Sequence, residues 1–105
     1  MAVSRQDIAL RDQDRDTLIA VFQRYPDIRE VVLFGSRATG HAKRASDIDL
    51  AVTAPGMSDG LWARFKGDLD ESPIILFIDV IRLDRLTDAE LRREIETDGV
   101  RIHQQ

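Results

Sequence analysis

The sequence contains no cysteine, and this absence excludes two classes of structure. Without thiols the chain can form neither a disulfide framework nor a thiolate metal site, and a cytoplasmic location is the simplest expectation. No apolar run approaches the roughly 20 residues that a membrane-spanning helix needs, so no membrane partner is expected. The charged, mixed segment 1–15 lacks the pattern of a secretion signal.

An excess of positive charge is also missing. The chain has 15 Lys and Arg against 19 Asp and Glu, for a formal net charge of −4. A protein that grips long nucleic acid usually presents a basic face, because phosphate neutralisation supplies much of the affinity. The one basic block, residues 37–44, is short, so stable nucleic-acid binding is not expected. An acidic chain can still hold a single nucleotide when a metal ion supplies the positive charge.

Repeats, low-complexity tracts and linkers are absent, and 105 residues predict a single domain over 1–105. Apolar periodicity and capping residues predict helices at 14–25 and 58–70, and a last helix that begins at a Thr87–Glu90 capping box and stops at Gly99. Short apolar runs predict strands at 30–34, 47–53, 74–81 and 100–103. The order and the short connections predict an α+β (mixed α/β) fold, with one small mixed sheet of three to four strands flanked by helices.

The most informative segment is 32–52, in which Gly35-Ser36 is followed, ten residues later, by Asp47-Ile48-Asp49. The same Asp-x-Asp spacing occurs at 12/14, 14/16 and 68/70, but there on helices predicted to be solvated. Asp47 and Asp49 instead begin an apolar strand, where residues i and i+2 project to the same face. Neighbouring carboxylates repel and lose hydration beside an apolar sheet. Mg²⁺, which prefers oxygen ligands, is therefore the expected occupant between them.

A third acid, Asp79, interrupts the predicted strand 74–81, where an unpaired charge is costly. If this strand lies beside 47–53, three carboxylates could hold two metal ions roughly 4 Å apart, one activating a hydroxyl and one steadying a triphosphate. Asp79 would then also be placed to accept the proton of the nucleophile. The alternative is an acid at a strand end that forms an ion pair with Arg82.

The Gly35-Ser36 turn has the features of a phosphate site. Gly35 lets the backbone approach a phosphate, and the next residues are predicted to open a short helix whose N–H groups attract anions. The Ser36 hydroxyl can donate to a phosphate oxygen, and Arg37 offers positive charge nearby. Ser46 is expected either to orient Asp47 or simply to lead into the strand.

Two other features have simpler explanations. Gly35-x4-Gly40 imitates a P-loop, but His41 and Ala42 stand where that motif needs Lys and Ser or Thr. Trp62 is predicted to be a core residue of its helix rather than a platform on which a base stacks.

The pattern Gly35-Ser36-x10-Asp47-x-Asp49, with a later Asp79 in an apolar strand, resembles the polymerase-β-like nucleotidyltransferase superfamily. The shortness of the chain points to its minimal nucleotidyltransferase branch, and the resemblance runs from about residue 31 to 102. Members of that branch often pair with a HEPN-domain toxin and act as the antitoxin, transferring AMP from ATP to a toxin tyrosine. The resemblance implies an ATP- and Mg²⁺-dependent transferase with the three aspartates as catalytic residues and a HEPN toxin as partner.

The resemblance leaves alternatives open. The chain could neutralise its partner by binding alone, or transfer the nucleotide to a small-molecule hydroxyl or a tRNA end. Many members carry arginine where this chain has Thr39, so a phosphate-facing charge is missing unless His41, Lys43 or Arg44 replaces it.

Overall fold

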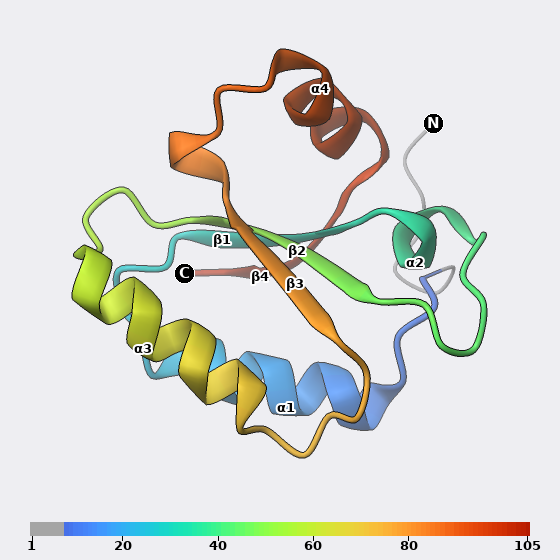
Figure 1. Cartoon of the computed structure of the whole chain (residues 1–105), viewed down its shortest axis with the longest axis horizontal. Helices are drawn as coiled ribbons and strands as arrows, with labels where there is room; N and C mark the ends of the chain where they lie inside the picture. The colour runs from blue at the N-terminus through green and yellow to red at the C-terminus, as the bar shows by residue number, and fades with distance from the viewer. Residues whose placement is uncertain (1–7) are drawn as a thin grey trace.

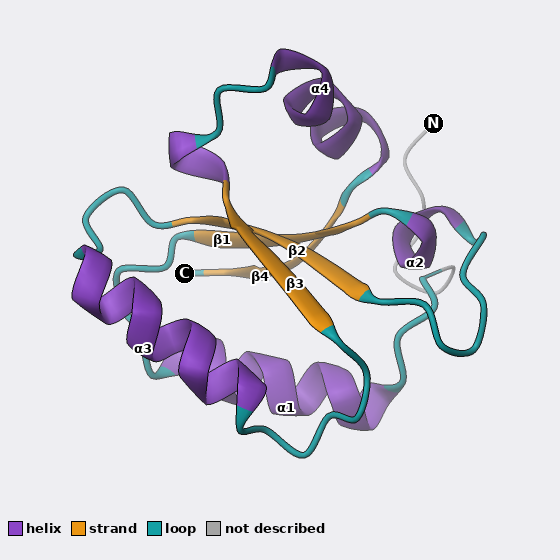
Figure 2. Cartoon of the chain, in the orientation of Figure 1, coloured by secondary structure: helices purple, strands orange, loops and turns teal. Residues whose placement is uncertain are grey.

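The computed structural model describes residues 8–105 and contains one mixed four-stranded sheet between two layers of helices (Figures 1 and 2). This confirms the predicted mixed α and β architecture. The elements in chain order are α1 (Asp12–Gln23), β1 (Glu30–Phe34), α2 (Ser36–Thr39), β2 (Ile48–Thr53), α3 (Asp59–Asp70), β3 (Ile78–Arg82), the 3-10 turn η2 (Leu83–Arg85), α4 (Ala89–Asp98) and β4 (Val100–Gln104).

The strand order is β3-β2-β1-β4, so β1 and β2 occupy the centre of the sheet. β1 runs antiparallel to both of its neighbours, whereas β2 and β3 are parallel. A parallel pair needs a crossover connection, and α3 supplies it across one face of the sheet (Figure 1). The parallel pairing brings the starts of β2 and β3 together, close to the end of β1.

The two faces of the sheet are covered unequally. α1 and α3 cover one face and build the main core, in which large side chains such as Phe22, Leu50 and Phe65 are fully buried. On the other face, α4 covers a small cluster built on Phe34, Ala51 and Ile95 (Figure 1). Strand alternation therefore sends residues 49, 51, 79 and 81 toward the α4 side.

Several predicted boundaries were wrong by one to four residues. The first helix begins two residues earlier than predicted and ends at Gln23. β2 begins at Ile48, so Asp47 immediately precedes the strand. β3 begins only at Ile78, because its ladder starts with the Ile48–Ile78 pair and the segment before it extends past the beginning of β2.

The predicted cap of the last helix was also wrong. Asp88, not Thr87, caps α4: its carboxylate accepts hydrogen bonds from the N–H groups of Glu90 and Leu91, both at 3.1 Å. A carboxylate at this position satisfies two free N–H groups and also interacts favourably with the positive end of the helix dipole. The predicted cap of α3 is confirmed, since Ser58 Oγ accepts from the Leu61 N–H at 3.2 Å.

Candidate active site

Asp49 and Asp79 lie side by side in the sheet. The parallel register of β2 and β3 pairs them directly, and paired residues project to the same face. That face is the one beneath α4, because Ala51, two residues beyond Asp49, packs in the α4 cluster. Asp49 is half-buried and Asp79 is exposed. The fold thus brings together two of the three acids singled out in the sequence.

The remaining acid, Asp47, lies just before β2 and is exposed. The pKa of Asp49 is raised above its ordinary value, first by burial and then by the charges of Asp79, Asp47 and Glu94. All three predicted acids therefore lie near enough for their charges to interact. Glu94 of α4 was not predicted; the signal that could have found it is its position next to Ile95, which packs against this face.

The Gly35 turn lies against Asp49. Gly35 follows β1, whose last residue, Phe34, pairs with Asp49 across the antiparallel ladder. Its backbone angles, φ 74° and ψ −156°, fall in a region that is essentially restricted to glycine. A Cβ atom at this position would lie 2.5 Å from Asp49 Oδ2. Glycine is thus required both by the backbone conformation and by the close approach of the carboxylate, and Ser36 opens α2 immediately afterwards.

Arg37 has a different role from the predicted one. Its side chain is buried, with 8% exposed, and donates to backbone carbonyls of the loop 40–47 and of the segment before α1. The Ala9 carbonyl accepts at 2.8 Å and the Ser46 carbonyl at 2.7 Å from Nη2 and 3.0 Å from Nε. Because the guanidinium is occupied in this way, Arg37 fixes the loop that leads to Asp47 rather than offering charge to a phosphate.

Ser46 also contributes to the loop. Its Oγ accepts from the Lys43 N–H at 2.8 Å, and its own N–H donates to the Lys43 carbonyl at 3.1 Å. The hydroxyl closes a tight turn that sets the approach of the chain to Asp47. Of the two alternatives, orientation of the following acid and simple strand entry, the geometry favours orientation through the backbone.

Thr39 and His41 lie near the Gly35 turn. Thr39 Oγ1 donates to the Gly35 carbonyl at 3.3 Å, and His41 Nδ1 lies 3.0 Å from the same hydroxyl. Thr39 therefore stabilises the turn from within. His41, Lys43 and Arg44 are all exposed, so any replacement charge comes from these solvent-facing side chains.

The alternative ion pair between Asp79 and Arg82 is wrong. Strand alternation sends the two side chains to opposite faces. Arg82 is buried on the α3 side, where it lies 3.3 Å from Asp84 and 3.7 Å from Asp59, and its guanidinium carbon sits 5.5 Å from the Trp62 ring centroid. Trp62 itself is half-buried and packs on the main core, as predicted.

A family model described as polymerase beta, nucleotidyltransferase matches residues 16–105, most of the chain. The chain belongs to the polymerase-β nucleotidyltransferase family. A search of curated proteins found no relative of significant similarity.

Solved structures share the fold of this nucleotidyltransferase. A crystal structure of a toxin–antitoxin with AMP-PNP matches at 24% identity with a TM-score of 0.66, covering 88% of this chain and 74% of that one. The toxin–antitoxin MntA–HepT matches at 21% identity and TM-score 0.61, covering 90% and 74%. A tri-AMPylated Shewanella oneidensis HEPN toxin in complex with an MNT antitoxin matches at 20% identity and TM-score 0.61, covering 91% and 74%.

The acids of this nucleotidyltransferase fit a hard divalent cation by charge and ligand type. In the described part of the chain, no three or more acidic or imidazole side chains are already drawn together at metal-binding spacing. The fit instead rests on the direct register pairing of Asp49 with Asp79; the pKa of Asp49 is raised first by burial and then by the charges of Asp79, Asp47 and Glu94. Carboxylate oxygens are the ligands that Mg²⁺ prefers. No helix in residues 8–105 is long and apolar enough to cross a membrane.

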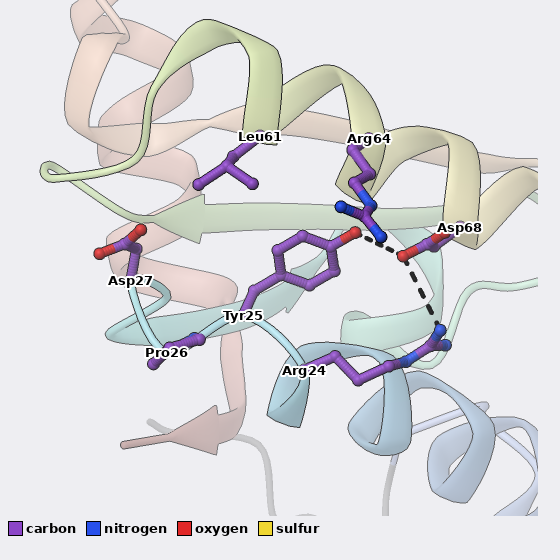
Figure 3. Close-up of a pocket in the computed structure, with 7 residues that line it drawn as sticks. All are labelled: Arg24, Tyr25, Pro26, Asp27, Leu61, Arg64 and Asp68. Atoms are coloured by element: carbon purple, nitrogen blue, oxygen red, sulfur yellow. Dashed lines mark hydrogen bonds and ion pairs between the residues drawn. The ribbon is translucent and has the colours of Figure 1, made fainter.

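A pocket away from these acids contains Asp68, one member of another Asp-x-Asp pair of the sequence. It has a volume of about 340 Å³, lies between the end of α1 and α3, and contains none of the predicted site residues (Figure 3). Here the Tyr25 hydroxyl donates to Asp68, and Arg24 lies 3.8 Å from the same carboxylate. Asp14, predicted to be solvated, is only 5% exposed and pairs with Arg11 at 3.2 Å. Asp68 therefore joins α3 to the end of α1, whereas Asp14 pairs within the start of α1.

Proposed function

We propose that this nucleotidyltransferase transfers AMP from ATP to a hydroxyl, expected to be a tyrosine, of a partner HEPN toxin and thereby acts as its antitoxin. The observation that carries the proposal is the register pair of Asp49 and Asp79 beside the Gly35 turn. Family membership supports the reaction class. The toxin–antitoxin complexes that share the fold, including one with AMP-PNP and one with a tri-AMPylated toxin, support the partner and the transferred group.

The donor nucleotide would lie over the Gly35 end of the site. The Gly35 turn lies against Asp49, and the Ser36 hydroxyl that follows it is available to donate to a phosphate oxygen. Asp47, Asp49 and Asp79 would hold Mg²⁺, expected as two ions, which supplies neutralisation of the triphosphate when bound. Arg37 keeps Asp47 in position through the Ser46 carbonyl.

The acceptor would be activated from the outer strand. Asp79 lies on β3, at the edge of the sheet, and is exposed, whereas Asp49 is half-buried between its neighbours. Asp79 is therefore the carboxylate that an incoming hydroxyl can reach. As the hydroxyl oxygen bonds to the α-phosphorus and the bond to pyrophosphate breaks, the hydroxyl proton passes to Asp79.

The test is the transfer of labelled AMP to a HEPN-domain protein co-expressed with this chain. Asp49→Ala and Asp79→Ala should each abolish labelling while the circular dichroism spectrum stays that of the folded chain. Asp16→Ala is the matched control, because Asp16 is an exposed aspartate on α1 and should leave labelling unchanged. Undiminished labelling by either site variant would remove the assignment.

A second experiment distinguishes AMP transfer from the alternative, in which the chain neutralises the toxin by binding alone. A chain in which Asp47, Asp49 and Asp79 are all replaced by alanine is expressed with the toxin. Loss of protection is expected if transfer is the antitoxin activity. Full protection by this variant would favour occlusion of the toxin.

A further inference from the structure

Two large apolar side chains are exposed immediately before Asp79. Ile75 is 89% exposed and Phe77 is 65% exposed, while the residues between and around them, Ile74, Leu76 and Ile78, pack toward the main core. The Ile48 N–H to Phe77 carbonyl hydrogen bond continues the strand pattern by one residue and places Phe77 on the side of Asp79, while Ile75 lies beyond a bend at Leu76. Folding gives no reason for leaving two such side chains in water next to carboxylates, and such exposure is typical of contact surfaces.

The backbone fixes where Phe77 lies. The Phe77 carbonyl accepts a hydrogen bond from the Ile48 N–H at 2.9 Å, so this residue still follows β2 one step before the first ladder pair, Ile48–Ile78. The same register continued by one residue sets Phe77 beside Asp47, as Asp79 is set beside Asp49. The exposed face therefore carries two neighbouring pairs, Asp49 with Asp79 and Asp47 with Phe77.

The order across the sheet separates the two substrates. The Gly35 turn lies on the β1 side of Asp49, because Phe34 of β1 pairs with Asp49. Phe77 lies on the opposite side, along the edge formed by β3. A nucleotide whose phosphates lie at the Gly35 turn leaves the β3 edge open, and the acceptor must arrive there to reach Asp79.

We infer that Phe77, together with Ile75, is the acceptor-side docking contact, on which a protein partner seats the apolar residues that flank its reactive hydroxyl. The inference rests on the proposed function and deepens it by assigning the surface that receives the acceptor. Two bare apolar side chains offer little to a hydrophilic small molecule. Beside Phe77, the charges of Asp79 and its register partner Asp49 oppose the phosphates of an RNA acceptor and complement a basic rim on a protein, whereas Ile75 lines a hollow with Arg11, Asp14, Arg37 and Arg44.

The test uses the HEPN protein that the wild-type chain modifies as the acceptor probe. Phe77→Ser should raise the KM for this protein about tenfold or more, the usual effect of removing an apolar anchor. The rate at saturating acceptor and the affinity for ATP should stay within about twofold of wild type, and Phe77→Leu should restore most of the loss. Leu61→Ser is the matched control: Leu61 is 38% exposed on α3, beside the pocket of Figure 3.

A binding measurement separates docking from chemistry. In an Asp49→Ala background, which carries out no transfer, adding Phe77→Ser should weaken calorimetric binding of the unmodified acceptor by a similar factor. Unchanged acceptor binding and KM would overturn the inference and leave the proposed function standing. Weaker ATP binding with normal acceptor binding would also overturn it, because the ring would then serve the nucleotide base. Absence of any protein modification by the wild-type chain would defeat the proposed function itself and the inference with it.

Discussion

Replacing Gly35 with alanine tests the geometry of the site at its most constrained point. The substitution forces a side chain into a backbone region that costs about 1–3 kcal/mol for residues other than glycine. Alanine recovers about 0.4–1 kcal/mol by restricting the unfolded chain. Because the new Cβ would lie 2.5 Å from Asp49 Oδ2, the carboxylate must also move. We expect a net destabilisation of about 1–2 kcal/mol and a displaced Asp49.

Gly40 provides the matched control five residues later. It also has a positive φ, 83°, but its ψ of 10° is left-handed helical, and a Cβ there meets no atom within 4 Å. An L-residue in that region costs about 1–2 kcal/mol. Alanine largely offsets this cost, because it reduces the conformational entropy of the unfolded chain. Gly40→Ala should therefore change the stability only slightly, and the difference between the two variants isolates what Gly35 does beside Asp49.

Thermal unfolding followed by circular dichroism measures the difference. At about 4–8 °C per kcal/mol for a domain of this size, Gly35→Ala should lower Tm by roughly 5–15 °C and Gly40→Ala by a few degrees at most. AMP transfer should fall with Gly35→Ala as it does with Asp49→Ala, and persist with Gly40→Ala. Equal stability and equal activity of the two glycine variants would show that the turn does not lie against the acid.

Three further predictions concern the site and its supports. Because the folded pKa of Asp49 is raised, its charge disfavours the fold; this loss of stability develops as pH rises from the ordinary 3.8 through the folded pKa. Asp49→Asn should thus raise Tm at pH 7 and lose that advantage near pH 3, as measured by thermal scans across pH. Arg37→Met should lower the free energy of unfolding in urea by about 3 kcal/mol and speed amide hydrogen exchange in residues 41–46. The control Arg44→Ala, at an exposed side chain, should change that free energy by no more than about 0.5 kcal/mol. Asp88→Ala should cost about 1 kcal/mol and Thr87→Ala almost nothing; the reverse order would restore the sequence-based cap.

The sequence predicted the helices and strands whose limits depend on local residue patterns. The strand over 30–34 and the Ser58 cap of α3 are found where the local pattern placed them, because each depends on neighbours within a few residues. The start of β3 could not be predicted in the same way. Residues 74–77 carry the same apolar pattern as the strand, but the ladder begins at Ile78 opposite Ile48, a limit set by the partner strand.

The site was predicted in part for the same reason. Asp49 and Asp79 could be selected because a carboxylate within an apolar strand is anomalous wherever the strand lies. Arg37 could not be assigned, because the carbonyls that occupy its guanidinium belong to Ala9 and to the loop before β2, which only the tertiary fold brings to it. Glu94 was missed because its effect on Asp49 depends on how α4 packs over the sheet.

Two unfavourable features of the chain meet at one point, and this coincidence argues for function more strongly than either feature alone. A turn at the end of β1 could use a left-handed glycine, as Gly40 does, without bringing backbone against a carboxylate. An apolar or amide side chain at position 49 would pack beside Ala51 without the burial of a charge and the repulsion by neighbouring acids that raise the pKa of Asp49. Strain that persists at one site is characteristic of active sites, since surrounding contacts must hold it in place. Here Arg37 supplies such contacts, because its guanidinium joins the Ser46 carbonyl, in the loop between the glycine turn and the acids, to the Ala9 carbonyl of the segment before α1.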